Sequence, residues 1–560
     1  MTPLQLLPDA LNASFKAVPA VMVSAMLLLF LGIGYVFRVA DTEDLWVAGR
    51  SIGNVENGMA IGANWMSAAS YLGMAALIAL SGYYGLAYVV GWSTGYFILL
   101  IFLAAQMRRF GKYTAPDFVG DRFDSDAARA IAALTTILIG FVYSVGQARG
   151  MGLVGIYVFG GDYTTMVVLM MSITVGYLAL SGMLGATKNM AVQYVILIVA
   201  FLAGLYAVGW TQGYSTILPH IEYGALLSEL DSQFTEPFAT DSFYLWVATA
   251  FSLIVGTCGL PHVLVRFYTV ESERTARWST VWGLFFICLL YWSAPAFAAF
   301  GTDLYANVVG PVYGANGMSG AEGDVIVVLA SQLANLPEWF VGLVAAGGVA
   351  AAIATTAGLF ISASSAAAHD IYTNIVNPDA TQRQQLLIGR GTIVALGAVV
   401  TVTALDPPAL VGELVALAFS LAGLVLFPMF FLGLWWENAN RQGALAGMTT
   451  GLVIWTAAVL NELVLATDAG PVVPVYADVF PAVGAALAGT PIVFAVTIAV
   501  SLATEEPDER IKRIVRQCHS PEPMGQQESA EEVATDGGQV SAESQPSSDA
   551  ESDGGPRRGE

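Results

Sequence analysis

Two stretches rich in small residues interrupt long apolar runs of this chain: Gly62-Ala63-Asn64-Trp65-Met66-Ser67 and Gly256-Thr257-Cys258-Gly259-Leu260-Pro261. A helix that is broken inside a bilayer exposes backbone groups, which are tolerated only where they line a cavity or bind a ligand. Each stretch lies in the first run of a block of five successive apolar runs. Paired breaks of this kind indicate the substrate and ion site of a secondary transporter.

The composition places the chain in a membrane. Of its 560 residues 56% are hydrophobic and 12% are charged, far from the averages of soluble proteins. We expect an external N-terminus at 1–17, one transmembrane domain at 18–503 and a disordered, acidic cytoplasmic tail at 504–560. No nucleophile motif or metal-ligand cluster is found in the sequence, so we expect no enzymatic activity, no cofactor and no nucleic-acid partner.

Apolar runs of about 20 residues are long enough to span a bilayer as helices. Thirteen candidates follow one another at about 18–38, 54–80, 83–107, 127–157, 163–183, 188–210, 242–267, 279–301, 325–370, 386–405, 409–435, 443–465 and 479–503. The ninth run is too long for one span, and we expect a short external helix ending near Pro337 before the span itself. The prediction is an all-α integral membrane protein with an inverted five-plus-five repeat, whose core repeats are 54–210 and 242–435.

Lys and Arg residues predict the orientation, because they are enriched in cytoplasmic loops. Basic residues follow the odd-numbered runs, whereas the loops at 211–241 and 302–338 contain neither Lys nor Arg. Lys16 is the one basic residue on the other side. We therefore expect a multi-pass protein of the cell membrane, embedded in the lipid bilayer, with the N-terminus outside and the C-terminus in the cytoplasm.

A sodium ion requires several oxygen ligands, and carbonyls released by a broken helix supply them within a membrane. Ala63 and Met66 offer carbonyls at the first break. In the ninth run Ala352, Thr355 and Thr356 share one helix face, since they are spaced at i, i+3 and i+4. The alternative is that the two threonines bond the carbonyls four residues before them.

The substrate is expected beside the two breaks. The candidate residues there are Asn64, Trp65, Ser67, Thr257 and Gly259.

Gln147 and Arg149 of the fourth run are further candidates, because polar residues within spans are expensive and are functional by default. The Arg149 guanidinium would bind a carboxylate through two hydrogen bonds; alternatively, it pairs with backbone carbonyls or with an acid of a loop. His262 would relay protons or form a structural hydrogen bond. Arg266 is expected to anchor the cytoplasmic end of its helix.

Four motifs resemble those of the sodium:solute symporter family, over about residues 43–440. They are Glu43-Asp44-Leu45-Trp46-Val47-Ala48-Gly49-Arg50, Tyr113-Thr114-Ala115-Pro116-Asp117-Phe118, the stretch from Gly256 to Val270, and Ala350-Ala351-Ala352-Ile353-Ala354-Thr355-Thr356-Ala357-Gly358-Leu359 with Ala368-His369-Asp370-Ile371-Tyr372. The stretch from Gly256 to Val270 is similar to the seventh helix of the cation/acetate symporter branch.

The resemblance implies a leucine-transporter-like fold in which the first helix of each repeat is broken. It also implies a sodium site with carbonyls from Ala63, Met66 and Ala352 and with hydroxyls from Thr355 and Thr356. Relatives that bind a second sodium carry an Asp where this chain has Met190, which argues against a second ion.

The function implied is sodium-coupled uptake of a small monocarboxylate by alternating access: acetate, propionate, pyruvate or lactate. The sequence leaves open a neutral or zwitterionic substrate such as proline or a sugar, and a transporter-like membrane sensor. Sodium as the coupling ion and an anionic solute are therefore the expected partners, and the sequence does not indicate an oligomeric state.

Overall fold

The computed structural model describes residues 15–38, 52–111, 114–214, 218–238, 242–309, 318–467 and 470–520. The described secondary structure is helical apart from one isolated bridge between Thr467 and Gly470. Most of the N-terminal segment, the motif Glu43–Arg50, Tyr113 and the part of the acidic tail from residue 521 onward lie outside these ranges.

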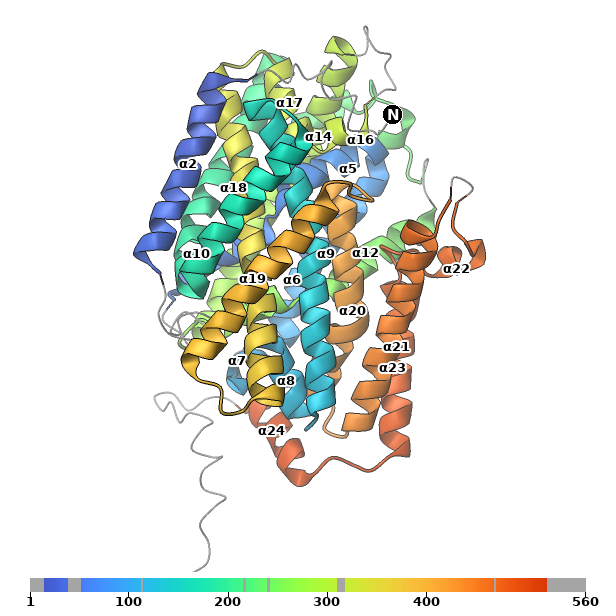
Figure 1. Cartoon of the computed structure of the whole chain (residues 1–560). Coiled ribbons are helices and arrows are strands. Elements are labelled where there is room, and N and C mark those ends of the chain that lie inside the picture. Colours follow the sequence, from blue (N-terminus) through green and yellow to red (C-terminus); the bar gives the residue numbers. More distant parts are fainter. Residues whose placement is uncertain are drawn as a thin grey trace, which may run out of the picture. The chain divides into compact units, whose positions relative to one another are not determined.

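The helices of the first block follow one another along the chain (Figure 1). They are α2 (Ala17–Val36), α4 (Asn54–Trp65), η3 (Ala69–Gly73), α5 (Met74–Ser81), η4 (Gly82–Gly85), α6 (Leu86–Phe102), α7 (Ala104–Phe110), α8 (Ala115–Arg122), α9 (Asp126–Phe159) and α10 (Tyr163–Thr211).

Short helices α11 (Pro219–Leu226) and η5 (Ser232–Phe234) lead into the second block. It consists of α12 (Phe243–Thr257), α13 (Pro261–Leu264), η6 (Val265–Phe267), α14 (Glu273–Val308), α16 (Gly320–Gly323), α17 (Ile326–Leu333), α18 (Glu338–Ser365), η7 (Ala366–Val376), α19 (Gln382–Ala404) and α20 (Val411–Trp435). Beyond it lie α21 (Arg441–Val459), η8 (Leu460–Val464), α22 (Pro474–Val479), α23 (Ala486–Ala503) and α24 (Glu509–His519).

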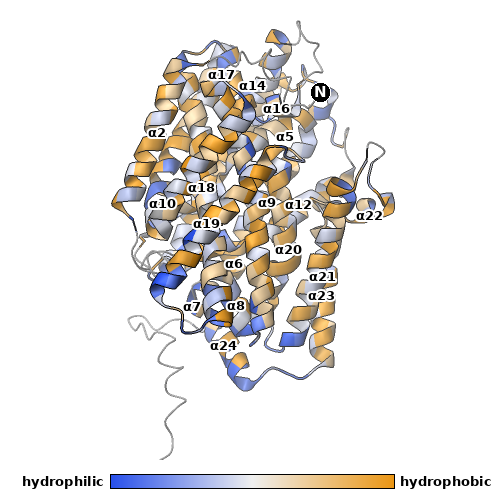
Figure 2. Ribbon diagram, viewed as in Figure 1, coloured by the Kyte–Doolittle hydropathy of each residue, from blue (hydrophilic) through white to orange (hydrophobic). Residues whose placement is uncertain are grey.

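Ten helices of the described chain are long and apolar enough to cross a membrane, and the bent pair α12 and α13–η6 makes an eleventh. Figure 2 shows apolar residues along these helices and hydrophilic residues at the start of α19 and around α24. Thirteen spans were expected. The number of spans counted by helix length and composition is smaller. Helix α4 ends after 12 residues and is not counted, and the apolar helix Tyr163–Ala179 is too short to be counted.

Local sequence explains where several helices begin and bend. Side chains of Thr114, Ser125, Asp162, Ser242 and Ser272 accept a hydrogen bond from a backbone N–H of the first turn of α8, α9, α10, α12 and α14, as N-caps do. Within α10, Gly182 has a φ of 56°, a conformation that glycine adopts readily. It divides α10 where the sequence predicted a boundary between two spans. The prediction at Pro337 is also confirmed, since α17 precedes it and α18 begins after it.

The long helices of the two blocks pack against each other rather than forming separate bundles. Helix α18 contacts α9 and α10, helix α4 contacts α14, and α20 contacts both α9 and α12. α18 is buried along its whole apolar length. This arrangement brings the break of α4, the break after α12 and the middle of α18 together inside the protein.

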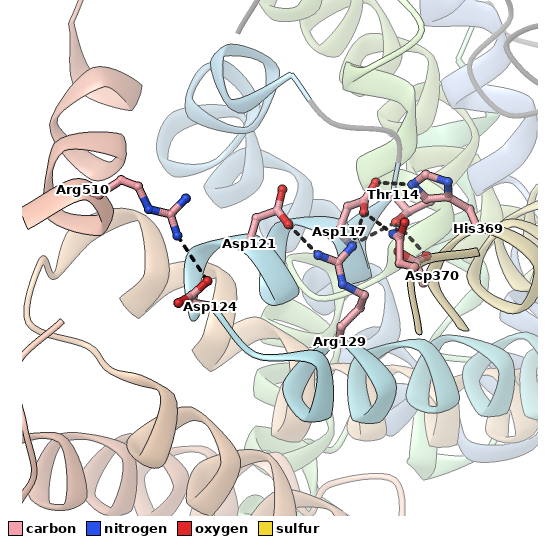
Figure 3. Close-up of polar contacts among 9 residues, drawn as sticks. Thr114, Asp117, Asp121, Asp124, Arg129, His369, Asp370 and Arg510 are labelled. Atoms are coloured by element: carbon pink, nitrogen blue, oxygen red, sulfur yellow. Dashed lines mark hydrogen bonds and ion pairs between the residues drawn. The ribbon is translucent and has the colours of Figure 1, made fainter. Parts of the chain in front are cut away.

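A polar network connects α8, the start of α9 and η7 (Figure 3). Asp117 receives hydrogen bonds from Arg129 at 2.6 Å and from His369 at 2.9 Å, and Thr114 donates to Asp370 at 2.8 Å. Asp117, His369 and Asp370 bring possible metal ligand atoms within 4.8 Å of one another, a cluster that the sequence did not reveal. Arg129, which also binds Asp121 at 2.5 Å, already supplies positive charge to it.

The tail begins with an ordered helix, which corrects the expectation of disorder from Thr504. Helix α24 buries Ile511, Val515 and Cys518, which lie at i, i+4 and i+7 and so share one face. Arg109 of α7 donates to the Cys518 carbonyl at 2.8 Å. Helix α24 therefore belongs to the packed domain.

The C-terminal end of α20 depends on Arg122, whose side chain is buried. Its guanidinium donates to the carbonyls of Gly433 at 2.6 Å, Trp436 at 2.8 Å and Ala439 at 3.0 Å. These contacts satisfy carbonyls that a helix end cannot satisfy by itself.

The substitution Arg122→Met should lower the free energy of unfolding by about 2–3 kcal/mol, since it leaves buried carbonyls without donors. Arg516→Met is the matched control. It removes an exposed ion pair with Glu437 near the same loop, and such pairs contribute about 0–1 kcal/mol. Thermal unfolding of the detergent-purified protein measures both variants, and equal losses would contradict this role for Arg122.

Candidate functional site: the two helix breaks

The interruption of α4 redirects its backbone hydrogen bonds. In a continuous helix the N–H of Ser67 would bond the Ala63 carbonyl, and that of Ser70 would bond the Met66 carbonyl. Here Ser67 N–H bonds Trp65 at 2.8 Å, and Ser70 N–H bonds Ser67 at 3.0 Å. The carbonyls of Ala63 and Met66 thus lose their usual helical donors, and both residues are completely buried.

Side chains from two other helices replace the missing partners of the break. The N–H of Ala68 donates to Oε1 of Gln147 on α9 at 2.8 Å, instead of bonding the Asn64 carbonyl. That carbonyl accepts the hydroxyl of Thr355 on α18 at 2.8 Å. Gln147 and Thr355 therefore lie at the break, and their predicted roles in binding substrate and sodium stay predictions.

The hydroxyls of the two threonines on α18 have different partners. Thr356 donates to the Ala352 carbonyl at 2.8 Å, the bond within one helix that the alternative interpretation described. Thr355 instead reaches across to α4. Ala352, Thr355 and Thr356 are all completely buried.

Asn64 connects the two breaks. Its side-chain amide donates to the carbonyl of His262, just after the second break, at 3.1 Å. Its Oδ1 lies so close to Gly358 of α18 that a Cβ there would come within 2.0 Å of it. Glycine at 358 is therefore required for the approach of α18 to this amide.

The second break bends α12 relative to α13–η6 by 44°. Thr257 donates to the Leu253 carbonyl at 2.7 Å and packs against Gly95 of α6. Gly259 lies against α20, where a Cβ would come within 2.3 Å of the Ala422 carbonyl. The contacts of both residues are those of close helix packing, so their predicted role in substrate binding stays a prediction.

Aromatic rings surround the α4 break. The ring of Trp65 meets Tyr96 edge-on at 4.8 Å between centroids and Phe419 at 5.5 Å. Phe419 also contacts Trp92 at 5.7 Å and Tyr143 at 5.8 Å. Ser67 is buried next to this group. The sequence did not identify Phe419, Tyr96 or Tyr143, because aromatic residues in spans are most often packing residues and nothing in their spacing distinguished them.

Arg149 does not contact the break through any described hydrogen bond. Its Nε donates to Asp324 at 2.7 Å, and its Nη1 donates to the Ala409 carbonyl at 2.8 Å. The guanidinium therefore has the partners of the alternative interpretation, an acid of a loop and a backbone carbonyl. This finding replaces the expectation that Arg149 clamps the substrate carboxylate.

Asp324 lies between α16 and α17 and is completely buried. Burial raises the pKa of Asp324 to about 6, although the Arg149 guanidinium and the Val411 N–H act in the opposite direction; Glu413 raises it further. The carboxylate also accepts the N–H of Val411, the first residue of α20, at 3.3 Å.

The raised pKa predicts a pH dependence of stability. The folded state holds the Asp324 proton more tightly than the unfolded chain, whose pKa is near 3.8. The contribution of Asp324 to the free energy of unfolding is therefore largest below that value, falls as the pH rises to about 6, and is constant above it. Thermal unfolding at a series of pH values should show this decline for the wild type relative to Asp324→Asn, and parallel pH profiles would contradict it.

The packing of two broken spans around a buried, partly unwound centre is the arrangement of a secondary transporter. Comparisons with known proteins agree. The model of the sodium:solute symporter family matches residues 45–451, most of the chain, and the chain belongs to this family.

Two relatives are described as uncharacterised symporters. One, from Cupriavidus necator, is 30% identical, and the match covers 87% of this chain and 91% of the relative. The other, from Bacillus subtilis, is 32% identical over 74% of this chain and 80% of its own length.

Two solved structures share the fold. A sodium-coupled sialic acid symporter in a substrate-bound, outward-open state has a TM-score of 0.71 at 14% identity, covering 88% of this chain and 99% of its own. A nucleobase-cation-symport-1 family transporter in a closed conformation has a TM-score of 0.51 at 12% identity, covering 84% and 98%. These likenesses confirm the all-α, leucine-transporter-like fold class.

The family assignment confirms a multi-pass membrane protein that is a secondary transporter and not an enzyme. It also supports sodium-coupled solute transport, with sodium as the coupling ion.

Proposed function

We propose that this protein couples sodium entry to the uptake of a small monocarboxylate, with acetate as the first candidate. The single observation that carries the coupling site is the hydrogen bond of Thr355 to the Asn64 carbonyl. It brings the face of α18 that carries Thr355 and Thr356 to a break where the Ala63 and Met66 carbonyls have lost their helical donors. An ion bound there would hold α4 and α18 together.

Sodium would then favour the conformation in which these helices are in contact. An ion shifts a conformational equilibrium only through its different affinity for the two states. The substrate would bind beside the breaks near Asn64, Trp65, Ser67 and Gln147, and opening to the other side would release both solutes. The orientation predicted from Lys and Arg makes this movement an uptake into the cytoplasm.

Two observations favour a small solute with an apolar part. Aromatic rings fill the space next to the α4 break, whereas a sugar needs many hydrogen-bonding partners. The stretch from Gly256 to Val270 also resembles the acetate branch of the family. Transport of one sodium with one monoanion moves no net charge, so the membrane potential contributes nothing. Each tenfold sodium gradient would then supply about 1.4 kcal/mol to uptake.

A neutral or zwitterionic solute is the second candidate. It is favoured by the ion pair between Arg149 and Asp324, because a paired Arg149 does not provide a positive charge for an anion. Proline uptake in the same assay tests this candidate.

Sodium-driven uptake of labelled acetate into proteoliposomes tests the proposal. Thr356→Ala should raise the sodium concentration for half-maximal uptake about tenfold, since the loss of one ligand is comparable to about 1.4 kcal/mol. Thr401→Ala is the matched control, because Thr401 makes the same kind of bond to the carbonyl four residues before it, on α19. It should leave the sodium dependence unchanged.

Two results would overturn the proposal. Equal sodium dependence in wild type and Thr356→Ala would remove the ion site from α18. Sodium-driven uptake of proline without uptake of acetate would replace the substrate class.

A further inference from the structure

Arg266 is a buried arginine whose surroundings differ from those of the other buried arginines. It lies in η6, four residues after His262, and its side chain is completely shielded from solvent. The sequence predicted that it anchors the cytoplasmic end of its helix. It does lie in the last turn, which ends at Phe267, but its side chain is enclosed among α4, α10 and η6.

The guanidinium of Arg266 has weak partners. Nη1 donates to the hydroxyl of Thr187 at 2.8 Å, and Nη2 donates to the thioether sulfur of Met190 at 2.8 Å. Nε has no hydrogen-bond partner. Within the described ranges of the chain, no carboxylate forms an ion pair with this side chain.

The buried Arg122 and Arg129 and the half-buried Arg149 have stronger partners than Arg266, although the Nε of Arg129 also lacks a hydrogen-bond partner. Arg129 is paired with Asp117 and Asp121, and Arg149 is paired with Asp324. Arg122 donates to three carbonyls in the last turn of α20 and the loop that follows it. Arg266 lacks both a carboxylate and such a set of carbonyls.

A buried cation without a counter-ion is costly, because several kcal/mol of hydration are lost and nothing replaces them. A thioether is only a weak acceptor. The free Nε–H and the uncompensated charge are therefore complementary to an anion. A carboxylate is the best match, since it can accept two hydrogen bonds from one guanidinium.

The position of Arg266 relates it to the helix breaks. Its backbone carbonyl accepts the Asn57 amide of α4 at 3.2 Å, two turns before the α4 break. One turn before Arg266, the carbonyl of His262 accepts Asn64 from the break itself. Neither ring nitrogen of His262 has a hydrogen-bond partner. Arg266 thus lies about two helical turns from the α4 break, toward the start of α4, on the side that the Lys and Arg pattern predicts to be cytoplasmic.

We propose that Arg266 binds a small monovalent anion, namely the carboxylate of the transported solute after it leaves the helix breaks. His262 lies one turn before it along the chain, with its ring against Tyr143 of α9 at 5.5 Å between centroids. The inference rests on the proposed function for the identity of the anion, but the anion site itself follows from the charge of Arg266.

Met190 allows a direct test. Met190→Asp places a carboxylate where the Met190 sulfur contacts Nη2, so it supplies the missing counter-ion from within the protein. Met190→Leu is the matched control, because it keeps an apolar side chain. Both variants leave Arg266 and the residues of the proposed sodium site in place.

Thermal unfolding of the full-length purified protein is measured in choline gluconate, because an Asp at position 190 could bind sodium as it does in relatives, and then with acetate replacing gluconate at constant choline concentration and ionic strength. In gluconate, the midpoint of thermal unfolding of Met190→Asp should be about 2 °C or more higher than that of Met190→Leu. Acetate should raise the midpoint of wild type and Met190→Leu by a larger amount than that of Met190→Asp. Equal midpoints in gluconate together with equal acetate shifts in all three proteins would overturn the proposal.

Chloride distinguishes the source of the anion. A chloride shift as large as the acetate shift would overturn the assignment to the solute carboxylate and leave a general anion site. The effect of Met190→Asp on stability does not depend on transport. If the proteoliposomes take up no acetate while this effect is present, the proposed function fails and the anion site stands.

Discussion

The architecture depends on one constraint, that the backbone of α4 cannot satisfy its own hydrogen bonds across the break at Met66. No water in the hydrocarbon core replaces the missing partners, so other helices must supply them. Gln147 of α9 accepts the N–H of Ala68, and Thr355 of α18 donates to the carbonyl of Asn64. The unwound segment is thereby fixed to two helices that lie 79 and 291 residues away in the sequence.

This constraint explains why the centre of the protein is both buried and polar. The bonds that stabilise the break also determine which backbone oxygens remain without a helical donor. If an ion binds these oxygens as proposed, and the contact between α4 and α18 forms only in some conformations, ion binding and the position of the two helices become a single equilibrium. Coupling of an ion to a movement requires no more than such a linkage.

Much of the fold could be predicted from local signals. Pro337 marked the boundary directly before α18, of which it is the N-cap, and the apolar runs predicted the spans. Contacts between distant segments could not be predicted. Nothing near Arg149 in the sequence identified Asp324, 175 residues away, so the sequence could not decide between a substrate carboxylate and a loop acid as its partner. Helix α24 was missed because the composition of the whole tail concealed the spacing of Ile511, Val515 and Cys518, although that spacing was a usable signal.

The pairing of Arg149 with Asp324 has a mechanical consequence. Asp324 also accepts the first N–H of α20, so a single carboxylate joins α9, α20 and the short segment between α16 and α17. Any movement that separated these three elements would have to expose two charges and break several hydrogen bonds at once. They should therefore move as one rigid body, and the hinge that opens the protein should lie outside that body, where α4 and α12 are already interrupted.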